Sequence, residues 1–151
     1  MGRLIIVSNR LPITVSGEGD EIVVAPSAGG LATGLKSVHE GCESLWVGWS
    51  GLDAHASPAA RTSLQAQLAS RRLVEVPLSA EEVTVYYEHI ANGVLWPIFH
   101  DQLEKLPNVI EGWETYEAVN ERYADMIAAC ARPGDTIWIH DFHLMRVPAL
   151  L

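Results

Sequence analysis

Leu4-Ile5-Ile6-Val7-Ser8-Asn9-Arg10, near the start of the chain, sets the architecture that we expect for the rest. An apolar run dominated by β-branched residues is typical of a strand covered on both faces, as found inside parallel sheets. The polar residues from Ser8 to Arg10 end this strand. Because parallel strands need long crossover connections, helices and further buried strands should follow downstream.

The same buried-strand pattern recurs along the chain and alternates with helical patterns. Further strands are predicted at 45–49, 73–76 and 136–139, and helices at 30–40, 58–71, 79–91 and 113–131. The last of these helices has the clearest apolar stripe, made of Tyr116, Val119, Tyr123, Met126, Ile127 and Cys130. Segment 92–107 contains Pro97 and has no clean period, so we expect helical turns and loops there.

A β-hairpin interrupts this alternation. Ile13-Thr14-Val15 and Ile22-Val23-Val24 flank a polar turn that contains two glycines, which is typical of paired antiparallel strands. Those glycines could let the hairpin move as a flap over a site. The whole pattern predicts an α/β fold: an open, mostly parallel sheet with helices on both faces and an inserted hairpin.

Composition favours one globular domain over residues 1–151. The chain is 48% hydrophobic with a formal net charge of −9, and its basic residues are scattered, which argues against a nucleic-acid partner. No apolar run approaches the roughly 18 residues that a membrane span needs, and no signal-peptide core is present. Cys42 and Cys130 have no CxxC spacing, so we expect two small buried side chains in a cytoplasmic protein.

The end of the chain looks like the opening of another crossover helix. Residues 144–151 are largely apolar and carry no capping signal, and such a helix needs more protein to cover it. We therefore expect a truncated domain.

In open parallel sheets, ligands bind outside the carboxyl ends of the strands, which here selects Ser8 to Arg10 and His140 to His143. The Arg10 guanidinium is suited to a phosphate or a carboxylate, although a surface ion pair with an acidic neighbour is an equal alternative. Gly29-Gly30 begins the first helix, where bare N–H groups and the helix dipole attract anions. A plain turn is the alternative at that position.

Asp141 follows the last predicted strand. Its carboxylate could accept hydrogen bonds from a ligand's hydroxyls, act as a base, or merely cap the next helix. Tyr86, Tyr87 and Trp96 offer aromatic faces that suit sugar rings, although such clusters more often form core.

Several other chemistries have no support in the sequence. His140 and His143 lack a third ligand, so we expect rim or core histidines and no metal. The spacing of Gly29, Gly30 and Gly34 fits neither a dinucleotide fingerprint nor a P-loop, and no GxSxG or HExxH motif occurs.

Five motifs, in this order and spacing, resemble the trehalose-6-phosphate synthase family: Ser8-Asn9-Arg10-Leu11-Pro12, Ser27-Ala28-Gly29-Gly30-Leu31, Trp46-Val47-Gly48-Trp49, Asn92-Gly93-Val94-Leu95-Trp96-Pro97 and Trp138-Ile139-His140-Asp141-Phe142-His143-Leu144. The resemblance runs from Arg3 to Leu151. It implies a retaining glycosyltransferase with two Rossmann-like domains, the GT-B arrangement. Such an enzyme transfers glucose from UDP-glucose to glucose 6-phosphate and releases UDP, without a metal or other cofactor.

The resemblance also implies roles for particular residues. Arg10 and Tyr87 match the residues that hold the phosphate of the acceptor, Trp96 and Asp141 match those that face its sugar, and Gly29-Gly30 matches the glycine pair near the donor. Asp141 is the residue expected to contribute to catalysis, by positioning the acceptor.

The family's remaining substrate-binding residues and its donor-binding domain would follow Leu151. Because they are missing here, we expect the chain alone to be inactive. Two alternatives stay open: a related enzyme that uses glycerol phosphate or a cyclitol phosphate as acceptor, and a non-catalytic regulatory subunit that binds sugar phosphates. Assembly into a homo-oligomer is also left open.

Overall fold

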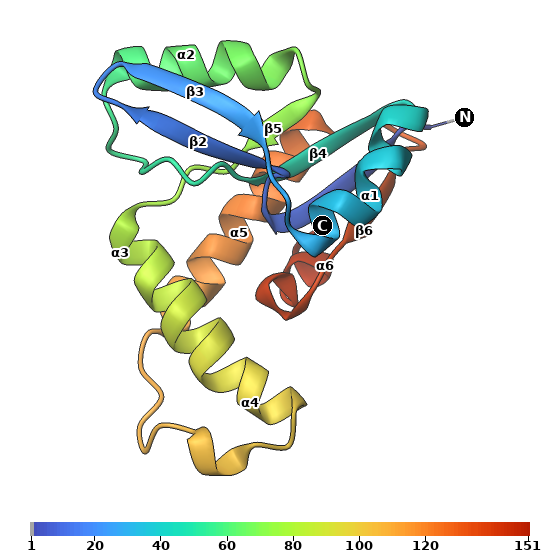
Figure 1. Ribbon diagram of the computed structural model, residues 1–151. Helices are drawn as coiled ribbons and strands as arrows, with labels where there is room; N and C mark the ends of the chain where they lie inside the picture. The colour runs from blue at the N-terminus through green and yellow to red at the C-terminus, as the bar shows by residue number, and fades with distance from the viewer. Residues whose placement is uncertain (1) are drawn as a thin grey trace.

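The computed structural model describes residues 2–151 and contains a four-stranded parallel sheet (Figure 1). The strand order is β5-β4-β1-β6, with β1 spanning Leu4–Arg10, β4 Ser44–Trp49, β5 Leu73–Glu75 and β6 Thr136–Ile139. β1 pairs in parallel with β4 on one side and with β6 on the other. The first strand of the sequence therefore lies inside the sheet, and its carboxyl end is next to that of the last strand.

The apolar run in β1 is buried because it faces two cores. Ile5, Ile6 and Val7 are all 0% exposed. Their side chains alternate: Ile5 and Val7 join one hydrophobic cluster, whereas Ile6 joins the other on the opposite face.

Helices cover both faces of the sheet. On the Ile5 side lie η1 (Thr84–Leu95), α5 (Trp113–Cys130), η3 (Phe142–Leu144) and α6 (Val147–Leu150). On the Ile6 side lie α1 (Gly30–Gly41), α2 (Pro58–Ala69) and the hairpin of β2 (Ile13–Glu18) and β3 (Glu21–Pro26). The predicted α/β fold, with its mostly parallel sheet, two helical layers and inserted hairpin, is confirmed.

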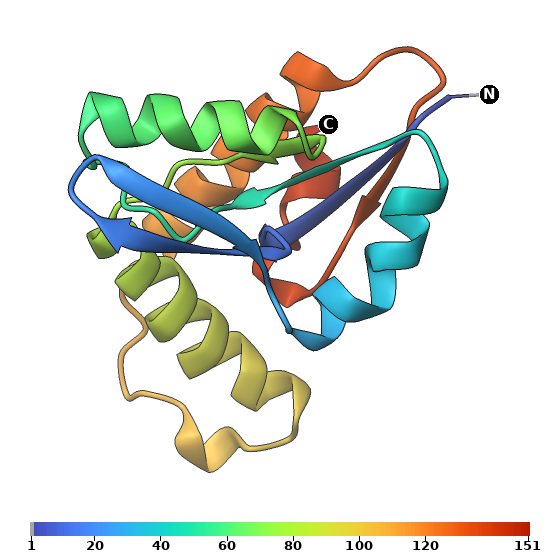
Figure 2. The same ribbon diagram turned by 45° about the horizontal axis from the view of Figure 1, so that its top comes forward.

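The hairpin is anchored, so the expectation of a loose flap is wrong. Figure 2 shows β3 running alongside α2, where Gln67 accepts a hydrogen bond from Val24 N at 3.2 Å and donates one to Ile22 O at 3.1 Å. Ile13, Ile22 and Val24 are buried in the core beneath it. Gly17 is paired with Ile22 inside the hairpin, and only Gly19 lies at the tip, so the glycines give the anchored part no freedom.

The helix predicted over 79–91 is longer than expected. Ser79 and Glu82 form the predicted capping box, but the chain stays helical through α3 (Ala80–Val83), the wide π-helical turns of η1 and α4 (Trp96–Phe99). Pro97 does not break it: the proline lies where the wide turns of η1 pass directly into α4, and the packing of η1 on the core outweighs its local preference. The irregular segment begins only after Phe99, with η2 (Leu103–Lys105) and a loop that ends at Gly112.

Both cysteines are free, but only one is even partly buried. Cys42 is exposed, contrary to expectation, because it lies in the surface turn between the end of α1 and β4. In residues 2–151 no helix combines the length and the apolar character that crossing a membrane would require.

Candidate functional site

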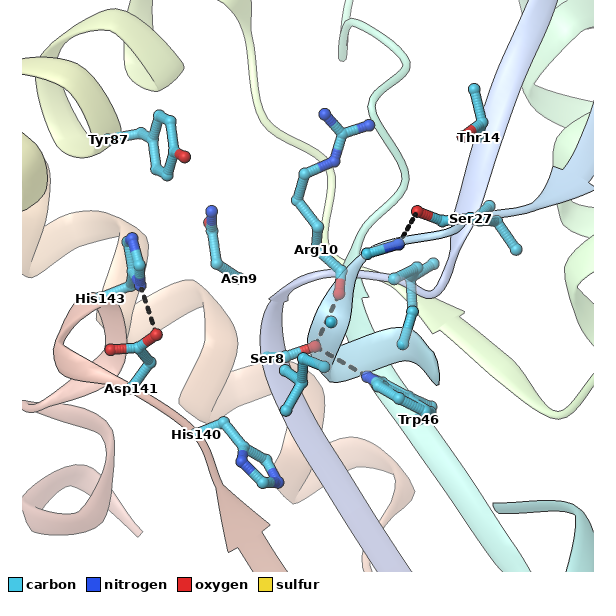
Figure 3. A pocket seen from close by; sticks show the side chains of 16 residues that line it. Ser8, Asn9, Arg10, Thr14, Ser27, Trp46, Tyr87, His140, Asp141 and His143 are labelled. Atoms are coloured by element: carbon cyan, nitrogen blue, oxygen red, sulfur yellow. Dashed lines mark hydrogen bonds and ion pairs between the residues drawn. The ribbon is translucent and has the colours of Figure 1, made fainter. Parts of the chain in front are cut away.

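A cavity of about 450 Å³ opens where β1 and β6 end, beside the segment that leads into α1 (Figure 3). Five of the six residues proposed from the sequence line it: Arg10, Gly29, Gly30, Tyr87 and Asp141. The sixth, Trp96, lines an adjoining cavity of about 360 Å³. The two cavities share Tyr87, Asp141 and His143, so the structure brings all six predicted residues together.

Arg10 extends into this space with its charge unneutralised. Among the described side chains no carboxylate forms an ion pair with it, so the alternative of a surface ion pair is wrong. Its guanidinium lies over the Trp49 ring, with Cζ 4.9 Å from the ring centroid. A cation–π contact of this kind holds the side chain and leaves its N–H donors free for an anion.

Gly51 makes the room that this position of Arg10 requires. The residue has a φ of +94°, and a Cβ there would come 2.4 Å from Nη2 of Arg10. A side chain at this position would therefore both strain the backbone and displace the guanidinium.

Buried hydroxyl groups fix the backbone that carries Arg10. Ser8 Oγ donates to Arg10 O at 2.6 Å and accepts a hydrogen bond from Trp46 Nε1 at 2.7 Å. Tyr123 donates to Asn9 O at 2.6 Å, and Tyr86 donates to the side-chain oxygen of Asn9 at 3.1 Å. Burial raises the pKa of both phenols, so they remain protonated donors.

Gly29 precedes α1 in ordinary extended geometry, and Gly30 is the first residue of the helix. Gly29 has φ −63° and ψ 150°, which many residues adopt, so the turn itself does not require glycine. A Cβ on Gly30 would meet nothing within 4 Å, and the first turn of α1 has neither an acidic residue nor a side-chain cap. The pair therefore leaves the amide end of α1 uncovered at the cavity.

Asp141 holds a strained backbone conformation at the end of β6. Its φ of 75° and ψ of 163° lie in a region used almost only by glycine, at a cost of about 1–3 kcal/mol. Oδ1 accepts a hydrogen bond from Phe142 N at 2.8 Å, so the predicted capping alternative applies to this oxygen. The side chain is 55% exposed and lines both cavities, which leaves room for a second role.

Of the three aromatic residues considered from the sequence, two line the cavities and one lies in the hydrophobic core. Figure 3 shows the Tyr87 hydroxyl turned toward the cavity, while its ring stacks on His143 at 5.3 Å between centroids. Trp96 is 45% exposed and packs against Phe142 at 5.6 Å. Tyr86 is fully buried in the core beneath Asn9, so this aromatic does not line the site.

Sequence reasoning assigned no individual role to three of the lining residues, namely Thr14, Ser27 and Trp46. Trp46 lies in a strand and looked like core alone, and Thr14 reaches the site only because the hairpin folds beside β1. His143 was expected to be a rim or core histidine, and it is both, since it is 9% exposed and lines the cavity. Within residues 2–151 no group of His, Cys, Asp and Glu side chains is arranged to hold a metal ion.

The family model for glycosyltransferase family 20 matches residues 2–151. The chain is 46% identical to a bifunctional trehalose-6-phosphate synthase/phosphatase from Thermoproteus tenax, across 99% of this chain and 21% of that protein. Among solved structures, it is similar to an α,α-trehalose-phosphate synthase (UDP-forming) from Burkholderia vietnamiensis, with a TM-score of 0.73 and 30% identity across 99% of this chain and 29% of that one.

A second structure, a synthase of the same description from Burkholderia xenovorans in complex with glucose-6-phosphate, gives a TM-score of 0.69 with 29% identity over 99% of this chain and 30% of that one. The chain thus spans about a fifth to a third of the length of these relatives.

Proposed function

Because the chain belongs to glycosyltransferase family 20, we propose that it is the N-terminal, acceptor-binding portion of a trehalose-6-phosphate synthase. The whole enzyme would transfer glucose from UDP-glucose to glucose 6-phosphate with retention, giving trehalose 6-phosphate and UDP. The observation that carries this proposal is the unpaired Arg10 guanidinium in a polar cavity that Tyr87 and Asp141 also line. A cation beside hydroxyl and carboxylate groups suits a sugar that bears a phosphate.

Each lining residue has a role that its chemistry supports. Arg10 and Tyr87 donate hydrogen bonds to the acceptor phosphate, and Asp141 accepts them from the sugar hydroxyls. Trp96 packs its exposed ring against the sugar. The open amide end of α1 at Gly29-Gly30 faces the anionic donor.

Retention needs no nucleophile from this chain. The anomeric hydroxyl of the acceptor attacks on the same face from which UDP leaves, and the departing phosphate takes its proton. Asp141 contributes by holding the acceptor in the orientation for attack. Consequently Asp141→Asn in the full-length enzyme should lower turnover severely, and unchanged turnover would refute this role.

Two anionic substrates require more positive charge than this chain supplies. Its net charge is −9, and the cavity offers one free guanidinium and one helix terminus. We expect the donor-phosphate cations and the donor-binding domain in the rest of the enzyme, so that the chain alone is inactive. The two free cysteines are consistent with a cytoplasmic location.

Release of UDP by the full-length enzyme tests the proposal. Arg10→Ala should lower kcat/KM for glucose 6-phosphate by about 100-fold, since it removes a charge-assisted pair, and Arg10→Lys should restore only part of it. Arg132→Ala, in the turn between α5 and β6, is the matched control and should leave the rate unchanged. The KM for UDP-glucose should stay the same in all three variants.

The choice of acceptor separates the alternatives. UDP release with glycerol phosphate or a cyclitol phosphate, but not with glucose 6-phosphate, would show a different acceptor. Binding of glucose 6-phosphate without UDP release by the full-length protein would favour a regulatory subunit. For the 151-residue chain itself, titration with glucose 6-phosphate should shift the NMR signals of Arg10 and Tyr87, and Arg10→Ala should abolish the shifts.

A further inference from the structure

The Asp141 carboxylate is anchored on one side only. Oδ1 accepts the hydrogen bond from Phe142 N, whereas Oδ2 lies 3.9 Å from Nδ1 of His143, beyond hydrogen-bonding distance. The strained backbone of Asp141 fixes the position of its Cβ atom. The terminal torsion of an aspartate is soft, so a small turn of the carboxylate can redirect Oδ2 while Oδ1 stays within reach of Phe142 N.

His143, by contrast, has a fixed ring and two unused nitrogens. It is 9% exposed and stacks between Tyr87 at 5.3 Å and Phe142 at 4.2 Å. Its carbonyl oxygen accepts a hydrogen bond from the buried Asn120 of α5, which holds the backbone as well. Neither ring nitrogen has a hydrogen-bond partner among residues 2–151, although both are buried.

Buried polar atoms without partners are uncommon, and each one needs an explanation. The Asp141 carboxylate is the acidic group that the structure places opposite Nδ1 (Figure 3). Closing the gap of 3.9 Å to the usual hydrogen-bond length of about 2.9 Å requires a movement of about 1 Å. Rotation of a half-exposed carboxylate can supply that movement without disturbing the core.

We propose that His143 is a positioning residue for Asp141, and that with an acceptor in the cavity its Nδ1–H donates a hydrogen bond to Oδ2 of the carboxylate. The carboxylate is then held at both oxygens, by Phe142 N and by His143, and its remaining lone pairs point at the sugar hydroxyls. This inference rests on the proposed function, which gives Asp141 the acceptor sugar. Burial lowers the pKa of His143, which favours the neutral ring. The proposal places the one proton of that ring on Nδ1.

Three substitutions in the full-length enzyme separate this role from simple packing. The amide nitrogen of Asn takes the place of Nδ1, that of Gln takes the place of Nε2, and Leu fills space without a donor. His143→Leu and His143→Gln should lower kcat/KM for glucose 6-phosphate about 10-fold, mainly through KM. His143→Asn should stay within about 3-fold of the parent, and the KM for UDP-glucose should not change in any variant.

A double-mutant cycle shows whether His143 acts through Asp141. In an Asp141→Ala background, adding His143→Leu should lower kcat/KM by less than about 2-fold. Equal losses in the two backgrounds, or equal losses for the Asn and Gln variants, would mean packing alone and overturn the proposal. A loss with Asp141→Ala but none with His143→Leu overturns it too, and leaves the proposed function standing; no loss with Asp141→Ala overturns both.

Nitrogen-15 NMR of the unmodified 151-residue chain keeps the proposal testable if the variants fail to fold. With glucose 6-phosphate at saturation, the His143 ring should be the Nδ1–H tautomer. Observation of the Nε2–H tautomer with the sugar phosphate bound would contradict the proposal. Absence of any binding to the chain and to the full-length enzyme would instead overturn the proposed function.

Discussion

Helices α5 and α1 support the candidate site from opposite faces of the sheet, and they are held in different ways. α5 buries six residues, including Tyr116, Asn120 and Tyr123, whereas α1 buries only Leu35 and His39. The polar side chains of α5 also reach the rim, where Tyr123 holds Asn9 and Asn120 holds the backbone of His143. On α1, Leu31 and Val38 remain exposed.

This difference assigns unequal stiffness to the two sides of the cavity. The side that we propose for the acceptor carries Arg10 and Asp141, and its backbone is fixed by buried hydrogen bonds from α5 in a core where each lost bond is costly. The side formed by the start of α1 has few buried contacts and opens more easily. We therefore expect the backbone on the proposed acceptor side to be preformed, with the Asp141 carboxylate left to turn, and the proposed donor side to be adjustable.

The largest effect is expected when a buried side chain is removed from each of the two helices. Tyr123→Ala should destabilise the fold by about 3–5 kcal/mol, because it empties fully buried volume and leaves Asn9 O unpaired. Leu35→Ala on α1 should cost about 2 kcal/mol, the lower end for its type. Urea denaturation measures both losses, and equal values would show that the helices are equally well anchored.

A polar substitution tests the bracing of the rim. Asn120→Ala should cost about 1–3 kcal/mol, since it leaves His143 O and Arg146 N without partners. Amide exchange in segment 141–146 should accelerate with it. Ser37→Ala, on the exposed side of α1, is the control and should change stability by no more than about 0.5 kcal/mol. Unchanged exchange in 141–146 would argue against the bracing.

A change of pH should loosen α1 before α5. Burial lowers the pKa of His39 despite the contact of its ring with the Arg71 carbonyl oxygen, so the folded chain favours the neutral ring. The unfolded chain therefore binds a proton on this histidine more readily than the folded chain, and stability falls as the pH drops below about 6.5. Hydrogen exchange should show α1 amides losing protection first, and His39→Gln should weaken that dependence. Simultaneous loss in α5 would contradict this order.

The smallest effect should come from a stabilising change within α1. A Cβ at Gly34 would meet nothing within 4 Å, and the residue lies inside the helix. Gly34→Ala should therefore add about 0.5–1 kcal/mol and slow amide exchange in α1, which narrows its difference from α5. Thermal denaturation of the two proteins checks the sign, and a lower melting temperature would count against open space at this position.

The sheet and its two layers could be predicted because the apolar run in β1 requires cover on both faces. The site's location followed from the strand ends, and the six proposed residues do meet around two adjoining cavities. Their roles in binding remain predictions. The bond between Gln67 and the hairpin could not be predicted, since it joins residues more than 40 positions apart with no pattern linking them.

Two other features could not be predicted from the sequence, each for a different reason. The helix that continues past Ala91 carries Asn92-Gly93 and Pro97, all of which disfavour helix locally, and packing of η1 on the core overrides them. The contact between Arg10 and Trp49 depends on β1 and β4 being neighbours, which the order of elements along the chain does not reveal.

Gly51 affects where a positive charge lies although the residue itself is uncharged. An alanine there would keep each ionisable group in the chain, and the two proteins would have the same net charge. Yet its methyl group would occupy space that the guanidinium of Arg10 now fills. A search of related chains for competent phosphate sites should therefore examine this neutral position as closely as the arginine itself.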